Sequence, residues 1–201
     1  MKYSFNNNLK IEKLLSAVFP KFCNNINCNI NITFSDEIPP IFLENDKFQG
    51  KEKKKLHEYP IDLLMGSYYP ESRSIVIYLQ GINMFVNAEG CNCNYEDVLM
   101  LVILHEIGHF WYHHLSNTYT YTENTNVQEW VAQSFAFLVM KENKDIKECM
   151  EKLSKHQPIK YQTYNEITPI SVNEFLDRLV EREDDLIGHV DMLEACLKYN
   201  C

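Results

Sequence analysis

The pattern of apolar and polar positions predicts both strands and helices. Residues 29–34 alternate polar and apolar side chains, which is typical of a half-buried strand. Residues 73–79 are rich in β-branched and aromatic side chains and predict a second strand. We expect a turn-rich approach over residues 66–70, where Gly and Pro are found, and a connection over residues 81–93.

Helical spacing and capping signals predict the remaining elements. A helix should begin near Asn94, an N-cap residue followed by two acidic residues, and continue to about Leu115. Thr125 and Gln128 match a capping box, which predicts a helix to about Lys141. Further helices are expected over residues 9–19, 146–155 and 171–199, and a loop over residues 36–59.

Composition and charge narrow the class of protein. The chain has 201 residues, of which 45% are hydrophobic, so we expect one domain over residues 1–201. Its net charge of −9 argues against direct nucleic-acid binding through phosphates. The most apolar run, residues 98–104, is too short to span a membrane. A polar, Asn-rich N-terminus and an odd number of cysteines, 7, favour reduced thiols and a cytoplasmic location.

Three residues of the long predicted helix carry the strongest chemical signal. His105, Glu106 and His109 form an H-E-x-x-H motif. Residues four apart share one face of a helix, so both histidines can direct a ring nitrogen at one ion. Two imidazoles and one carboxylate suit Zn²⁺ and leave a fourth position for water. Glu106 can then act as the general base that takes a proton from this water. The alternative is a pair of core histidines, which would need two buried partners.

The third metal ligand must come from outside this motif. Glu129 lies near the start of the next predicted helix, and antiparallel packing of the two helices would return it to the metal. A glutamate at this place is also favoured by the helix dipole alone. Glu123, in the preceding loop, is the reserve candidate. A third histidine ligand in an H-E-x-x-H-x-x-G-x-x-H pattern is excluded, because Tyr112 and Leu115 occupy the Gly and His positions.

The two helices together resemble a known family. His105-Glu-Ile-Gly-His109, followed by Glu129-Trp-Val-Ala-Gln-Ser-Phe-Ala136, is similar to the ImmA/IrrE group of zincin-like metallopeptidases, whose second helix usually has Asn where Gln133 stands. The resemblance covers about residues 66–141, including an edge strand at 75–79, and leaves residues 1–65 and 142–201 as extensions. It implies that His105, His109 and Glu129 bind zinc. It also implies a cytosolic peptidase that acts on regulatory proteins.

We therefore expect an α+β, zincin-like fold in which a small mixed sheet with an exposed edge strand packs on the two site helices. The hypothesis is an endopeptidase with one zinc ion per chain and a protein or peptide substrate. Two alternatives stay open. One is a non-catalytic zinc-binding sensor or interaction module, against which the intact Glu106 argues. The other is a metal-dependent amidase that acts on small molecules.

Several other polar residues are interpreted more simply as structural. His113 and His114 lie one turn beyond the motif, but three successive ligands along a helix cannot converge on one tetrahedral ion. Donors to the oxyanion of amide hydrolysis could come from a group of aromatic and histidine side chains, namely Tyr119, Tyr121, His156, Tyr161 and Tyr164. Cys91-x-Cys93 with Cys23-x4-Cys28 could form a second zinc site, although free thiols are the simpler interpretation.

Overall fold

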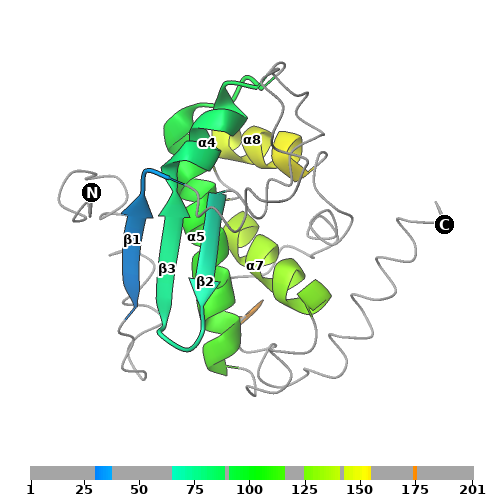
Figure 1. Cartoon of the computed structure of the whole chain (residues 1–201). Coiled ribbons are helices and arrows are strands. Elements are labelled where there is room, and N and C mark those ends of the chain that lie inside the picture. Colours follow the sequence, from blue (N-terminus) through cyan, green and yellow to red (C-terminus); the bar gives the residue numbers. More distant parts are fainter. Residues whose placement is uncertain are drawn as a thin grey trace.

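The described part of the chain has α+β architecture. The computed structural model describes residues 30–37, 65–88, 91–115, 125–140, 143–154 and 174–175. Over these residues, a small mixed sheet lies on one side of a long helix, and further helices cover the other sides of that helix (Figure 1). The helix expected at 9–19 and the loop expected to contain Glu123 lie outside the described residues. So do most of the loop predicted at 36–59 and most of the helix predicted at 171–199.

The sheet has the strand order β1–β3–β2 within the described residues. β1 (Asn31–Ser35) is parallel to β3 (Ser74–Tyr78), and β2 (Gly66–Tyr69) is antiparallel to it. The strands predicted at 29–34 and 73–79 are thus confirmed, with boundaries shifted by one or two residues. Ile75 and Ile77 of β3 are fully buried, because alternate side chains of a strand point to the same face and this face meets the core.

Two predictions about the sheet are wrong. Residues 66–70 were expected as a turn-rich approach, but residues 66–69 form β2. This strand continues into β3 through a turn that begins at Pro70 and holds Arg73 at a φ of 49°. The strand expected at the edge, 75–79, is instead the centre of the sheet, because β1 and β2 pair with its two sides. Strand propensity reports how well a residue fits a pleated surface and does not report its partners. The edge strand that packs on the long helix is therefore β2.

The connection predicted over residues 81–93 is also wrong in its first part. α4 (Leu79–Val86) follows β3 directly, so Leu79 begins a helix instead of ending a strand. Ile82 and Phe85, three residues apart, are buried and give α4 an apolar face against the core. Burial of this face outweighs the cost of about 1 kcal/mol that Gly81 carries inside a helix.

The long helix, α5 (Tyr95–Leu115), is the centre of the structure and confirms the prediction for residues 94–115. It begins as expected, because the backbone N–H of Glu96 donates to Oδ1 of Asn94 at 2.9 Å. Every residue from Val98 to Leu104 is buried. An apolar surface on all sides suits a helix that packs on the sheet and on the other helices at once.

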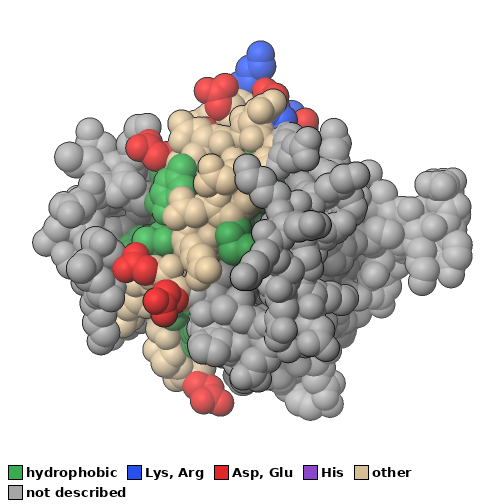
Figure 2. Space-filling model, turned by 45° about the horizontal axis from the view of Figure 1, so that its top comes forward, with side chains coloured by type: hydrophobic (Ala, Val, Ile, Leu, Met, Phe, Trp, Pro, Cys, Tyr) green, Lys and Arg blue, Asp and Glu red, His purple; other side chains and the backbone are tan. Residues whose placement is uncertain are grey.

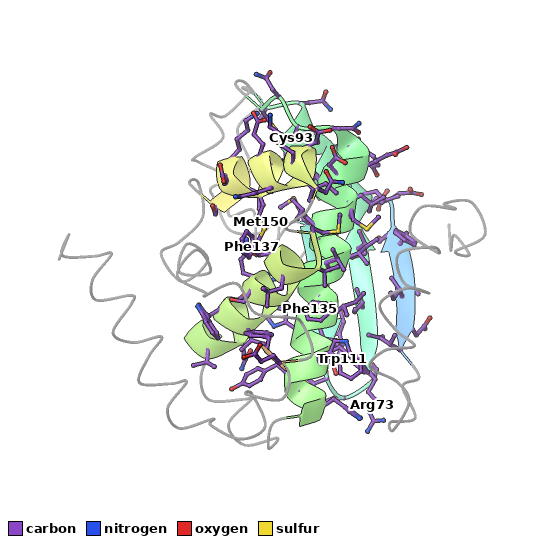
Figure 3. All side chains as sticks on the ribbon, turned by 180° about the vertical axis from the view of Figure 1, so that it is seen from behind. Arg73, Cys93, Trp111, Phe135, Phe137 and Met150 are labelled. Carbon is purple, nitrogen blue, oxygen red and sulfur yellow. The ribbon has the colours of Figure 1, made fainter. Side chains whose placement is uncertain are left out.

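Two further helices cover α5 on the side away from the sheet. α7 (Thr125–Met140) and α8 (Lys144–Ser154) confirm the predictions for residues 125–141 and 146–155. Phe135 of α7 is buried, and Figure 3 shows it between α7 and α5.

Acidic side chains are spread over the face of the molecule that Figure 2 shows. No helix within the described ranges combines the length and apolarity needed to cross a membrane.

Candidate metal centre

Three side chains from two helices meet in one place. His105 and His109 lie one turn apart on α5, and Glu129 lies in the second turn of α7. The Nε2 atoms of the two histidines are 3.1 Å apart. Oε2 of Glu129 is 3.2 Å from Nε2 of His105 and 3.4 Å from Nε2 of His109. These three atoms form a nearly equilateral triangle, and this group could hold a metal ion.

The size of the triangle fits a small tetrahedral ion. With metal–nitrogen and metal–oxygen distances of about 2.0–2.1 Å, a tetrahedral zinc site places neighbouring ligand atoms about 3.3 Å apart. The three observed separations, 3.1, 3.2 and 3.4 Å, bracket this value. Two nitrogens and one carboxylate oxygen are also a ligand set that zinc accepts. The residues present therefore fit zinc in both geometry and chemistry.

His105 is held in the orientation that a ligand needs. Its Nδ1 lies 2.9 Å from Oε1 of Gln133, and because an amide oxygen only accepts, the ring must donate a proton from Nδ1. In the neutral ring, the lone pair is then on Nε2, which faces His109 and Glu129. Hydrogen bonds of this kind fix the tautomer and the orientation of metal-binding histidines. Gln133 thus has a supporting role that the sequence pattern alone did not assign.

The charges of the three residues are coupled. Burial lowers the pKa of His105, but the hydrogen bond and charge of Glu129 outweigh it, and the net shift is upward. Burial raises the pKa of Glu129, but the nearby histidines outweigh it and hold this pKa well below its ordinary value. Glu129 is therefore an ionised carboxylate that faces two imidazoles. A cation at the centre of the triangle would be stabilised by this charge.

Glu106 is held apart from the triangle. Glu106 is 5% exposed, and its carboxylate accepts a hydrogen bond from the backbone N–H of Tyr68 on β2. Burial raises its pKa above the ordinary value, although the neighbouring histidines act in the opposite direction. A Cβ atom on Gly66 would lie only 2.7 Å from Oε1 of Glu106. The glycine at the start of β2 therefore leaves the space in which this carboxylate sits.

A second glycine sets the distance between the two helices. A Cβ on Gly108 would lie 2.6 Å from Cα and 2.9 Å from the carbonyl oxygen of Ala132. The absence of a side chain at this position lets α5 and α7 approach backbone to backbone. Contacts between the two helices show their relative direction. His109, Gly108 and His105 of α5 contact Glu129, Ala132 and Gln133 of α7 in that order, so the residue numbers fall along one helix as they rise along the other. The antiparallel packing expected for Glu129 is thus present.

The two histidines beyond the motif lie at the end of α5 and do not join the triangle. Nδ1 of His113 is 2.8 Å from the hydroxyl of Tyr68, so this contact joins α5 to β2. The ring of His114 stacks on Phe110 with centroids 5.6 Å apart. Burial raises the pKa of Tyr68 to about 12. Tyr68 therefore contacts both Glu106, through its backbone, and His113, through its side chain, and no motif in the sequence signalled it.

Several candidates named from the sequence lie outside the described residues. They are the reserve ligand Glu123, the oxyanion candidates Tyr119, Tyr121, His156, Tyr161 and Tyr164, and the cysteines Cys23 and Cys28.

Comparisons with protein-family models, with curated proteins and with solved structures found no match. The interpretation of this centre therefore depends on its own residues and geometry.

Proposed function

We propose that this protein is a zinc-dependent endopeptidase with a zincin-like fold, in which His105, His109 and Glu129 hold the ion. The convergence of these three ligand atoms, with the separate carboxylate of Glu106 nearby on the same helix, is the observation that carries the proposal. A bound zinc ion would supply Lewis acidity, polarising a peptide carbonyl and making water a nucleophile near neutral pH.

The residues of the chain have distinct parts in this proposal. Glu106 is the general base, which accepts the proton of the attacking water and delivers it to the leaving amine. The backbone N–H of Tyr68 donates a hydrogen bond that stabilises the ionised form of Glu106 and orients its carboxylate. A raised pKa, caused by burial, makes the same group a better proton carrier than an exposed glutamate.

The substrate is proposed to be a peptide segment of a protein, bound in an extended form. β2 is an edge strand of the described sheet, and it is the strand that contacts Glu106. An extended peptide beside an edge strand gains main-chain hydrogen bonds that do not depend on its sequence. The edge strand was expected at 75–79, but β3 has partners on both sides, so the substrate segment is proposed to lie beside β2.

The first test measures metal content. The purified chain should carry about one zinc ion, because one three-ligand set is present. His105→Ala, His109→Ala and Glu129→Ala should each lose most of it, while Glu123→Ala should retain it. Full zinc retention in both histidine variants would contradict the metal site itself.

The second test separates an enzyme from a zinc-binding sensor. Glu106→Gln keeps the shape of the side chain but removes the base, so zinc content and folding should be unchanged. Cleavage of a substrate found by screening co-expressed proteins should fall by about 10²–10⁴-fold. If Glu106→Gln works as well as the wild type while the ligand variants fail, the metal serves structure or sensing and the peptidase proposal is refuted.

A further inference from the structure

Three cysteines gather at the other end of α5. Cys91 and Cys93 lie just before the first residue of α5, and Cys149 lies on α8. The thiol of Cys93 is hydrogen-bonded to both Cys149 and Cys91. Figure 3 shows Cys93 beside α8. Its distance from the candidate metal centre is large, because His105 lies ten positions after Tyr95 on α5, about 15 Å along the helix axis.

Cys93 is the central cysteine of the three, because it contacts both of the others. Cys149 is 2% exposed and belongs to the core, whereas Cys91 and Cys93 are half-buried at its margin. Among the described residues, the group with fully convergent ligand atoms is His105, His109 and Glu129, and the three sulfurs do not converge in the same way. Contacts of one thiol with two others suit pairwise exchange better than chelation of one ion.

We propose that Cys93 is a peroxide-reactive thiol that forms a disulfide with Cys149. The half-buried position of Cys93 lets a small hydroperoxide reach it, while the buried Cys149 waits in hydrogen-bond contact. Cys91 is the weaker partner for Cys93, because the two residues are only two positions apart and their disulfide would close a very small ring. In an extended chain, the Cα atoms of such residues are about 7 Å apart, which is longer than most disulfides allow.

The two steps balance without any further reactant. The thiolate of Cys93 attacks one oxygen of the hydroperoxide. A sulfur–oxygen bond forms, the oxygen–oxygen bond breaks, and the leaving alkoxide takes a proton to become an alcohol. The thiol of Cys149 then attacks the sulfur of the resulting sulfenic acid. A disulfide forms, and the hydroxide that leaves takes the proton of Cys149 to become water. Two thiols are oxidised and one peroxide is reduced.

The electrostatics at the three sulfurs assign the same roles. The hydrogen bond from Cys149 is the main cause that lowers the pKa of Cys93 to about 7, and Lys152 acts in the same direction. Burial raises the pKa of Cys91 to about 11, and the hydrogen bond to Cys93 raises the pKa of Cys149. Near neutral pH, Cys93 is thus the most ionised of the three thiols, and its neighbours are the S–H donors.

The test is peroxide oxidation of the reduced full-length chain at pH 7. Limiting hydrogen peroxide should give a peptide that links Cys93 to Cys149 as the main disulfide, found by mass spectrometry of a non-reduced digest. Initial sulfenic acid, trapped with dimedone, should appear on Cys93 at least about tenfold faster than on Cys91, because the thiolate is the nucleophile.

Variants assign each sulfur its step. Cys93→Ser should abolish the linked peptide. In Cys149→Ala, a small apolar residue preserves the core. The sulfenic acid of Cys93 should form more slowly in this variant, because the hydrogen bond that lowers the pKa of Cys93 is lost. After complete oxidation, the dimedone adduct on Cys93 should nevertheless be several-fold more abundant than in the wild type, because no disulfide consumes the sulfenic acid. Cys91→Ser is the matched control and should keep the Cys93–Cys149 link. Circular dichroism before oxidation shows whether each variant has folded.

Three results would overturn the proposal. The first is a main disulfide that omits Cys93 or joins it to a cysteine other than Cys149. The second is a sulfenic acid found first on Cys91. The third is a second metal ion per chain that is lost in Cys93→Ser but kept in His105→Ala, since the thiols would then be a metal site.

Discussion

Replacing Gly108 by alanine should destabilise the protein, although the same change stabilises most helices. Alanine is favoured over glycine inside a helix by about 1 kcal/mol. At this position, however, the new Cβ would lie 2.6 Å from Cα and 2.9 Å from the carbonyl oxygen of Ala132. Both are backbone atoms, so no side-chain rotation relieves the contact, and α5 and α7 must move apart.

The size of the effect follows from two opposing terms. Overpacking of a well-packed core costs about 1–3 kcal/mol, and a contact with backbone belongs at the upper end. Subtracting the gain of about 1 kcal/mol in helix propensity leaves a net loss of about 2 kcal/mol. Separation of the helices also carries Glu129, one turn from Ala132, away from the histidines. Zinc affinity should therefore fall by about 10–100-fold, the range seen when the support of a ligand is disturbed.

Two measurements check this prediction. Urea unfolding of the metal-free protein gives the free energy of unfolding without the contribution of bound metal. Competition with a chelator gives the zinc affinity. If Gly108→Ala is as stable as the wild type and binds zinc equally well, the close approach of α5 and α7 is wrong.

Gly66→Ala is the matched comparison. Its new Cβ would lie 2.7 Å from Oε1 of Glu106 and 2.9 Å from Cγ1 of Val102, which are side-chain atoms. Because side chains can rotate away, we expect a smaller loss of stability and little change in zinc affinity. Displacement of Glu106 should instead reduce cleavage of any substrate found. The two variants thus separate the packing of the ligands from the placement of the base.

Three further predictions concern the contacts around the centre. Gln133→Leu removes the acceptor of the His105 ring, so zinc affinity measured by chelator competition should fall by about 10–100-fold; unchanged affinity would contradict the orienting role of Gln133. Tyr68→Phe removes the hydroxyl that contacts His113 but keeps the backbone N–H that donates a hydrogen bond to Glu106. Urea unfolding should therefore show a loss of about 1 kcal/mol in the free energy of unfolding, with full zinc content. Loss of zinc in this variant would contradict the prediction. In the metal-free protein, the stability from the raised pKa of His105 is lost as the pH rises through that pKa, and the stability from the lowered pKa of Glu129 is lost as the pH falls through that one. Their pair should therefore stabilise the fold most fully between about pH 4.5 and 6.5, and urea unfolding across pH should show this maximum in the wild type but not in Glu129→Gln.

The helices of the described part were largely predictable from the sequence, because their signals are local. Asn94 and the acidic residues after it mark the start of α5, and the apolar run that follows is long enough to require burial. α4 was missed because its apolar spacing covers only eight residues and contains Gly81. A short helix of this kind is stabilised by packing on the core more than by its own propensity.

The sequence by itself determined that His105 and His109 share one face, since a spacing of four residues fixes their geometry on any α-helix. It did not determine where Glu129 would be, because that position depends on how closely α5 and α7 pack at Gly108 and Ala132. Nor did it determine that β2 would supply the backbone N–H for Glu106, or that Cys149 would meet Cys93. These contacts join residues far apart in the chain, and a local pattern carries no information about distances that only the packing of whole elements sets.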